Sequence, residues 1–153
     1  SEINHLNLFK LYSLPIHIFR LPGIYGPGRS VFDKIRNGQI TEIIKKNHFF
    51  SRIYVEDIGS AINKSLNNPT PGEIFNLSDD MPCQSSEIVR YAASLIKISK
   101  IKTLSYDDPK LNEKIRSFYF DNKRVRNLKI KKILDWTPKY RNYKLGLKRI
   151  LEI

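Results

Sequence analysis

The sequence predicts a soluble α/β fold in which short strands alternate with amphipathic helices. Apolar residues recur at helical spacing in several segments, and β-rich runs lie between these segments. The run 16–21 is apolar at nearly every position, which is typical of a parallel strand covered on both faces. It ends abruptly at Pro22-Gly23, and a Gly-Pro-Gly turn follows at Gly26 to Gly28. Because α/β proteins bind ligands at the carboxyl ends of their strands, we expect a ligand site here, although a plain turn gives the same pattern.

Size and composition narrow the class of protein. The 153 residues correspond to about one domain, and no apolar run approaches the roughly 20 residues of a membrane span. No signal-peptide pattern is present. The single cysteine, Cys83, excludes an internal disulfide and a cysteine-based zinc site, and the three histidines share no metal-binding spacing. We therefore expect a cytoplasmic protein without a bound metal.

The net charge of +12 is concentrated in the last third of the chain. Residues 97–153 contain 17 Lys and Arg against 6 Asp and Glu, whereas residues 1–96 contain 10 against 9. Such a basic segment is compatible with a lysine-rich solvated surface, with a site for an anionic small molecule, or with nucleic-acid binding. Nucleic acid is the least favoured partner, because the basic residues are not interleaved with stacking aromatics.

The first half of the chain is predicted to contain three helices and four strands. Pro15 ends the first helix near Ser13, and Ser30 and Gly38 bound a short helix between them. Asp57 is expected in the first turn of the next helix or as its cap. In chain order, the predicted elements are a helix over 2–13, a strand over 16–21, a helix over 31–37, strands over 40–44 and 51–55, a helix from 57 to 67, and a strand over 73–77.

The second half is predicted to be mostly helical. Ser85 or Ser86 caps a helix over 87–97, and a short strand over 102–106 follows. Asp107-Asp108-Pro109 favours a helix start, although 107–116 is ambiguous, and 118–125 reads as a strand or an extended loop. Asn127 caps a helix over 128–134, and a last helix is expected over 143–151.

The order of the motifs resembles a known family. The strand ending RLPGIYGPGR is followed by RIYVEDI, a helix, a strand reading IFNLSDD, and a capped helix ending LDWTP. This series is similar to the C-terminal half of the extended short-chain dehydrogenase/reductase superfamily, the NAD-dependent epimerase/dehydratase group. The closest resemblance is to an atypical branch that carries RLxGIYGPGR, FSRIxVxDI and SFYxxNKRV. The resemblance implies the last part of a doubly wound NAD(P)-binding Rossmann sheet plus a small α/β substrate domain.

The resemblance also implies boundaries between parts. Residues 1–29 would end the Rossmann domain with a helix, the sixth strand and a nicotinamide loop. Residues 30–56 would be an insertion belonging to the substrate domain. Residues 57–80 would supply a Rossmann helix and the seventh strand, and residues 81–153 the C-terminal substrate domain.

The cofactor implied by the resemblance is NAD or NADP, and the loop Pro22, Gly23, Ile24 and Tyr25 would lie against its nicotinamide ring. Proline fixes φ and offers a rigid wall, and glycine lets a backbone approach a flat ring closely. Many relatives that act on nucleotide sugars have Asn at the Gly23 position. This departure argues against a nucleotide-sugar substrate.

Three arginines are candidate ligands of a small, anionic substrate: Arg29, Arg52 and Arg116. Arg52 either pairs with Glu56 or Asp57 at the surface or points into the cleft. Arg116 matches an arginine that binds a substrate diphosphate in some relatives, and a guanidinium grips phosphate bidentately. A solvated arginine at a helix end is the alternative. In the same family the aspartate that corresponds to Asp57 has a structural role.

The family's catalytic groups are expected outside these residues. A Tyr-x-x-x-Lys pair and a glycine-rich phosphate loop would lie before Ser1, and the 153 residues are predicted to lack both. The chain is therefore interpreted as the C-terminal portion of an oxidoreductase, epimerase or dehydratase, inactive and unable to bind NAD(P) by itself. A non-catalytic NAD(P)-binding sensor or scaffold protein is the alternative. Relatives commonly dimerise through the helix that includes residues 2–13, so a homodimer of the whole protein is expected.

Overall fold

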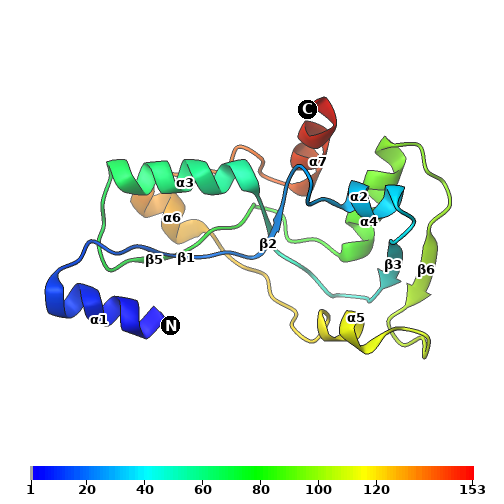
Figure 1. Ribbon diagram of the computed structural model, residues 1–153, viewed down its shortest axis with the longest axis horizontal. Coiled ribbons are helices and arrows are strands. Elements are labelled where there is room, and N and C mark those ends of the chain that lie inside the picture. The colour runs from blue at the N-terminus through cyan, green and yellow to red at the C-terminus, as the bar shows by residue number, and fades with distance from the viewer. Residues whose placement is uncertain (1) are drawn as a thin grey trace.

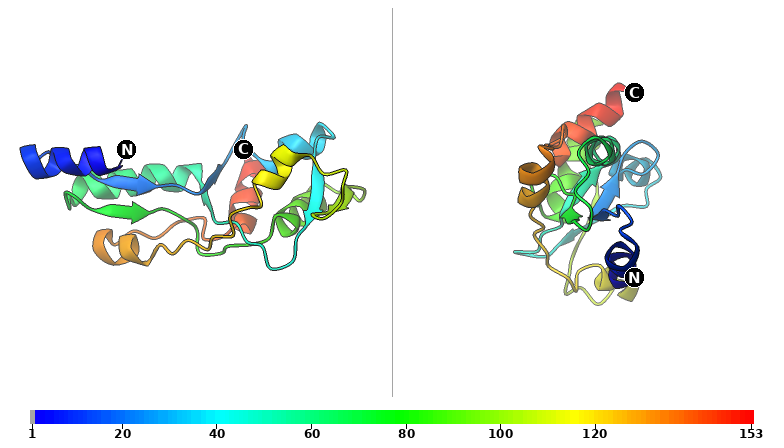
Figure 2. Two further views of the ribbon diagram at one scale, coloured as in Figure 1. Left: turned by 90° about the horizontal axis from the view of Figure 1, so that it is seen from below. Right: turned by 90° about the vertical axis from the view of Figure 1, so that its left-hand side faces the viewer.

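The computed structural model describes residues 2–153 and confirms the predicted α/β fold. The molecule is elongated (Figures 1 and 2). One end holds α1 (Glu2–Tyr12), α3 (Val55–Asn67), α6 (Leu128–Leu134) and the strands β1 (Ile18–Arg20) and β5 (Ile74–Asn76). The other end holds α2 (Val31–Arg36), β3 (Thr41–Ile44), α4 (Ser85–Leu95), β6 (Lys102–Ser105) and α5 (Glu113–Ser117). The pair β2 (Gly23–Tyr25) and β4 (Arg52–Tyr54) lies between the two ends, with α7 (Tyr143–Glu152) above it in Figure 1.

All three strand pairs of the described residues are parallel. Strand β1 pairs with β5, β2 with β4, and β3 with β6. In register, Phe19 lies opposite Phe75 and Ile24 lies opposite Ile53. After β5 the chain changes its pairing partner from β1 to β4. Leu77 N donates to Arg20 O at 3.0 Å, and Asp79 N donates to Arg52 O at 2.7 Å. The segment after β5 thus connects the pair β1–β5 to the pair β2–β4 by backbone hydrogen bonds.

Strand β2 corrects the prediction of an irregular loop over Pro22 to Tyr25. Residues 23–25 are extended and paired with β4, and the turn begins only at Gly26, which exchanges backbone hydrogen bonds with Arg29. Pro22 and Gly23 are weak strand formers, so local propensity concealed a pairing that depends on a distant segment.

Two helix starts also differ from the prediction. Gln84, rather than Ser85 or Ser86, is the N-cap of α4. Helix α5 begins after Asn112, whose side chain accepts from Lys114 N at 2.7 Å, and the segment from Asp107 to Leu111 forms turns instead. Residues 118–125 form no strand: 118–120 continue in turns after α5, and the loop alternative holds for 121–125.

Three hydrophobic clusters stabilise the molecule. The first joins β2, β4, α2, α4 and α7 and includes Tyr54 and Phe32. The second joins β4, α3, β5 and α6 around Phe75 and Trp136, and the third joins β3 to the segment that ends at Tyr119. Four residues of the first cluster also line the second of the two cavities described below: Tyr25, Ile88, Tyr143 and Leu147. None of the described helices is both long and apolar enough to span a bilayer.

Candidate functional site

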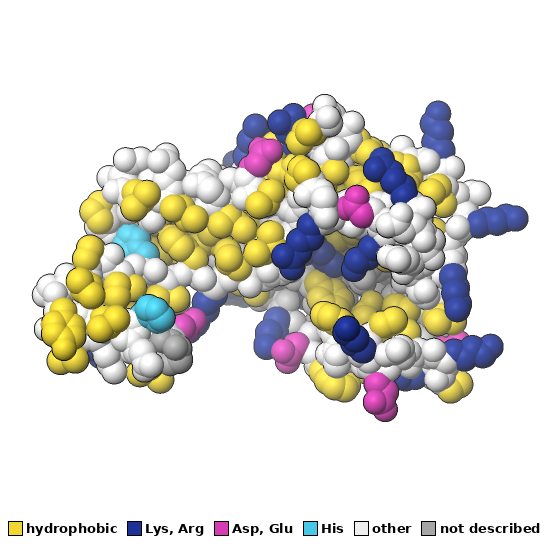
Figure 3. All heavy atoms as spheres, viewed as in Figure 1, with side chains coloured by type: hydrophobic (Ala, Val, Ile, Leu, Met, Phe, Trp, Pro, Cys, Tyr) yellow, Lys and Arg dark blue, Asp and Glu magenta, His cyan; other side chains and the backbone are white. Residues whose placement is uncertain are grey.

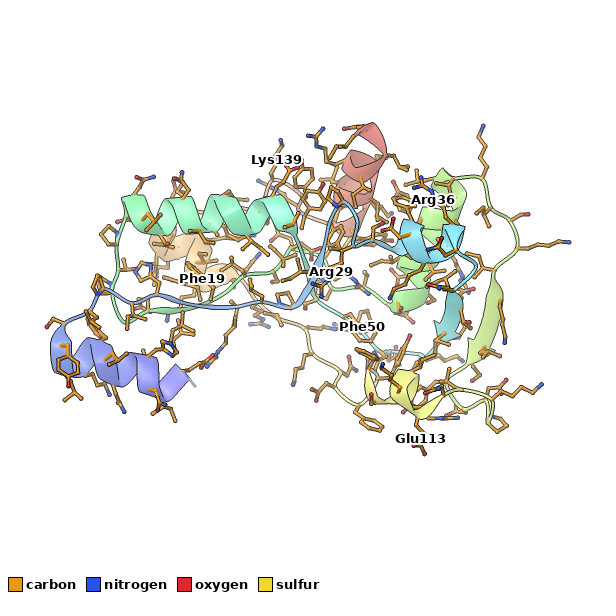
Figure 4. The ribbon with its side chains drawn as sticks, viewed as in Figure 1. Phe19, Arg29, Arg36, Phe50, Glu113 and Lys139 are labelled. Atoms are coloured by element: carbon orange, nitrogen blue, oxygen red, sulfur yellow. The ribbon has the colours of Figure 1, made fainter. Side chains whose placement is uncertain are left out.

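A cavity of about 350 Å³ opens at the carboxyl ends of β1 and β5, and we call it the Pro22 cavity. This edge of a parallel sheet is where α/β proteins bind ligands. Phe50 lies on the side of the chain that faces α5 (Figure 4). The cavity is lined by Arg20, Leu21, Pro22, Phe49, Phe50, Ser51, Asn76, Phe118, Asp121, Lys123 and Val125.

The segment 118–125 is tied to the opposite wall of the Pro22 cavity by hydrogen bonds that involve side chains. Val125 N donates to Ser51 Oγ at 2.8 Å, and Phe49 N donates to Asn122 Oδ1 at 2.9 Å. The ammonium of Lys123 pairs with Asp121 at 2.7 Å. These contacts connect the two walls of the cavity without a sheet.

A second cavity, of about 480 Å³, lies among α2, α4 and α7, and we call it the α2–α4–α7 cavity. It brings together four of the predicted site residues: Ile24, Tyr25, Arg29 and Arg52. The remaining lining residues are Gly28, Ser30, Val31, Asp33, Lys34, Ile40, Ser85, Ile88, Val89, Tyr143 and Leu147. No residue lines both cavities, so the predicted site residues are divided between two places.

Gly23 lines neither cavity. It is exposed, and a Cβ built on it would meet only Ser51 O at 3.7 Å and Arg52 Cγ at 3.8 Å, which are ordinary contact distances. A side chain at this position is therefore compatible with the observed backbone.

Arg52 lies beside the α2–α4–α7 cavity and makes no ion pair with Glu56 or Asp57. Its Nη1 donates to Phe50 O at 3.1 Å and lies 3.3 Å from Cys83 Sγ. Within residues 2–153, Nε and Nη2 of this guanidinium have no hydrogen-bond partner. Of the two alternatives raised by the sequence, the geometry supports the one in which Arg52 faces a cavity.

Arg116 lies outside both cavities. Its three nitrogens donate to three backbone carbonyls, with Nε to Leu111 O at 3.2 Å, Nη1 to Tyr106 O at 2.8 Å and Nη2 to Asp108 O at 2.5 Å. This guanidinium holds the turn before α5 together, and nothing in its geometry favours a phosphate ligand.

Asp57 has the structural contacts expected of it, but with an unexpected partner. It lies in the first turn of α3, and its buried carboxylate accepts from Lys139 N at 2.7 Å and from Tyr140 N at 3.0 Å. Burial raises the pKa of this carboxyl, while the two backbone hydrogen bonds lower it. Asp57 therefore anchors the segment that leads into α7.

Asp79 is a buried acid to which sequence reasoning gave no role. Its Oδ1 accepts from Met81 N at 3.1 Å, whereas Oδ2 is buried and has no partner among the described residues. Burial raises the pKa of the Asp79 carboxyl to about 7, and Asp80 and Asp57 contribute in the same direction. The signal in the sequence was the pair of aspartates directly after a strand.

The Tyr-x-x-x-Lys spacing does occur in the chain, which corrects the prediction that it is absent. The pairs are Tyr106 and Lys110, Tyr119 and Lys123, and Tyr140 and Lys144. None spans a single helix, so the lysine is not placed on the tyrosine's helix face. The Tyr140 hydroxyl donates to Glu56 Oε2 at 3.0 Å, and the Lys144 ammonium lies over the ring of Tyr91 instead. The described residues assemble no such dyad.

Comparison with known proteins shows which solved structures share this fold. No family model and no curated protein matches the chain. A functionally unknown conserved protein from Silicibacter pomeroyi DSS is 43% identical, with a TM-score of 0.87 over 93% of this chain and 50% of that one. The dTDP-glucose 4,6-dehydratase of Bacillus anthracis, solved with NAD, is 21% identical, with a TM-score of 0.76 over 99% of this chain and 48% of that one. An epimerase from Methanothermobacter thermautotrophicus is 19% identical, with a TM-score of 0.79 over 99% and 46%.

These matches define the fold. The chain has the fold of one half of Rossmann-type epimerases and dehydratases, which confirms the predicted fold class. It spans about half the length of the solved structures it matches. Structures that contain NAD, NADH and NADPH are among them.

Proposed function

We propose that this chain forms the C-terminal half of an NAD(P)-dependent oxidoreductase, epimerase or dehydratase that acts on a small molecule. The observation that carries the proposal is the position of Pro22, which lines a cavity at the carboxyl ends of two parallel strands. The cofactor-bound enzymes among the structural matches support the same assignment.

The nicotinamide wall is assigned to Pro22 and Gly23. Proline is rigid, and the exposed glycine leaves its backbone open to a flat ring. Ile24 and Tyr25 line the other cavity, and we assign them a supporting role. The nicotinamide supplies the hydride chemistry when bound. This half of the protein would contribute the surface against the nicotinamide ring and the lining of a substrate cavity.

A side chain at Gly23 tests this assignment. Gly23→Leu fits the backbone, but its side chain would occupy the space assigned to the nicotinamide. In the protein encoded by the whole reading frame, we expect the substitution to weaken NADH binding by at least about 10-fold, measured by NADH fluorescence titration. Gly59→Leu is the matched control, because a Cβ at Gly59 of α3 meets nothing within 4 Å, and we expect it to leave binding unchanged.

A second experiment uses the isolated chain of residues 1–153. We expect it to show no saturable NADH binding by calorimetry. Micromolar NADH binding by this chain alone would contradict its assignment as one half of the protein. Unaltered binding in Gly23→Leu would contradict the assignment of Pro22 and Gly23 as the nicotinamide wall. NADH binding by the whole protein without turnover of any carbonyl or sugar substrate would favour the alternative, a cofactor-binding sensor.

A further inference from the structure

The α2–α4–α7 cavity has the size and walls of a small-molecule site. Its volume of about 480 Å³ falls within the range of roughly 300–1,000 Å³ that is usual for ligand pockets. Two tyrosine rings, Tyr25 and Tyr143, contribute to the wall. The aliphatic part of the lining consists of Ile24, Val31, Ile40, Ile88, Val89 and Leu147.

The charged lining of this cavity is strongly biased towards cations. Arg29, Lys34 and Arg52 face a single acid, Asp33. The carboxylate of Asp33 already accepts from Ser30 N and from Ser30 Oγ, both at 2.9 Å, and these bonds lower its pKa. Asp33 is therefore committed to the start of α2, and the cations retain an excess of two charges.

The cations of this cavity are available to a ligand. Within residues 2–153 the side chains of Arg29 and Lys34 form no hydrogen bond or ion pair, and Arg52 uses only Nη1. Figure 4 places Arg29 at the turn after β2 and Arg36 farther along α2. Ser85, the first residue of the 11-residue helix α4, also lines the cavity, so the positive end of that helix dipole adds to the field.

We propose that the α2–α4–α7 cavity binds a phosphate monoester that carries a small flat or aliphatic group. A phosphate monoester has a charge of about −1.5 to −2 at pH 7, which matches the excess of two positive charges. Arginine is the side chain best suited to bidentate phosphate contacts, and the apolar wall would cover the organic group. Every lining residue belongs to this chain and none lines the Pro22 cavity, so the inference goes beyond the proposed function and is tested without NAD(P).

Phenyl phosphate is the probe for this site. We expect it to bind the ¹⁵N-labelled chain saturably at low salt with a Kd of about 1 mM or lower, with the largest NMR shifts at the amides of Gly28, Ser30 and Ser85. Inorganic phosphate tests the charge alone and benzyl alcohol tests the ring alone. Each should bind at least about 5-fold more weakly than phenyl phosphate, because each lacks one half of the interaction.

A pair of double variants tests whether the cavity's own cations are responsible. We expect Arg29→Gln/Lys34→Gln to raise the Kd for phenyl phosphate by about 10-fold or more. Arg36→Gln/Lys148→Gln removes the same charge from exposed residues outside the cavity and should change the Kd by less than about 2-fold.

Each remaining outcome contradicts the proposal. Absence of saturation at about 10 mM phenyl phosphate excludes a site of useful affinity. Equal losses in the two double variants indicate general attraction to a basic protein. Equal affinity for inorganic phosphate excludes the organic group from the site, and shifts centred on Phe50 and Lys123 place the anion in the Pro22 cavity instead.

Discussion

At the residue scale, Asp79 is a buried carboxyl whose hydrogen bonding is incomplete. The residue is 2% exposed, one carboxylate oxygen has no hydrogen-bond partner, and the charge of Arg52 lowers the pKa less than burial raises it. Its backbone N–H and Oδ1 nevertheless hold the chain between β4 and Met81. Asp79 thus stabilises the fold through its backbone N–H and Oδ1, whereas burial of its negative charge destabilises the fold.

The cost of that charge predicts a pH dependence. The pKa of Asp79 is about 7 in the folded protein and about 3.9 in the unfolded chain. The native state therefore binds more protons between these values, so this carboxyl's contribution to stability is fully present below about pH 4 and is lost as the pH rises through 7. In Asp79→Asn the amide oxygen still accepts from Met81 N and the titration disappears. We expect the free energy of unfolding of wild type, relative to this variant, to fall by roughly 2–4 kcal/mol between pH 4 and pH 8, measured by urea denaturation.

Asp107→Asn is the control for this measurement, because Asp107 is exposed. Its difference from wild type should stay constant over the same range. A constant difference for Asp79→Asn as well would mean that water or a rearrangement solvates the buried oxygen.

The sequence singled out arginines as candidate site residues without revealing what they contact. Arg29 and Arg52 were selected for their charge, and the structure brings them to one cavity because β2 pairs with β4. Arg116 has the same chemistry, but three carbonyls of its own turn use its donors. Which acceptor an arginine finds depends on tertiary packing, and residue type and spacing contain no information on this.

At the element scale, boundaries set by local chemistry were predictable. The helix α2 lies between Ser30 and Gly38 as expected, because Ser30 pairs with Asp33 in a capping box and Gly38 adopts a φ of 64°. Asn127 precedes α6 as expected, but its side chain donates to Ser78 O and Asp80 Oδ1 instead of capping the helix. Local rules thus predicted where α2 and α6 begin. They could not predict the hydrogen bonds of Asn127, whose partners lie far away in the sequence.

Two helical glycines predict opposite effects of the same substitution. A Cβ on Gly146 of α7 would lie 2.2 Å from the Tyr25 hydroxyl and 2.7 Å from two ring carbons, so Gly146→Ala must displace the Tyr25 ring or separate α7 from β2. We expect it to destabilise the protein by about 1–3 kcal/mol. Gly59 of α3 has open space around it, and Gly59→Ala should stabilise by about 0.5–1 kcal/mol through helix propensity.

Urea denaturation of both variants measures this difference, and the intrinsic gain of alanine is common to the two. A stabilising Gly146→Ala would show that the contact between α7 and the Tyr25 ring is looser than the structure indicates.

At the scale of the whole molecule, charge and apolar surface are segregated. Figure 3 shows hydrophobic side chains gathered over the end that holds α1, β1 and β5, and Lys and Arg mostly over the other end. Among the described residues, strand β1 pairs only with β5, and α1 contains no buried residue. The sequence predicted β1 as covered on both faces, but within residues 2–153 its residues are only half-buried or exposed. Phe19 packs against the second hydrophobic cluster, so the described residues cover β1 only in part.

Helix α1 should therefore be much less stable than helix α4. It is attached by the paired hydrogen bonds of Arg20 to Glu2, at 2.8 and 2.6 Å, and by the ring of Phe9 against Gly72. The ion pair is solvent-exposed, and isolated helices of this length are marginal in water. Helix α4 also has 11 residues, but five of them are buried, which makes it a matched comparison. In the isolated chain we expect amide hydrogen exchange to be at least about 100-fold faster in α1 than in α4. Equal protection of the two helices would mean that another surface covers α1, and exchange that accelerates on dilution would identify that surface as a second copy of the chain.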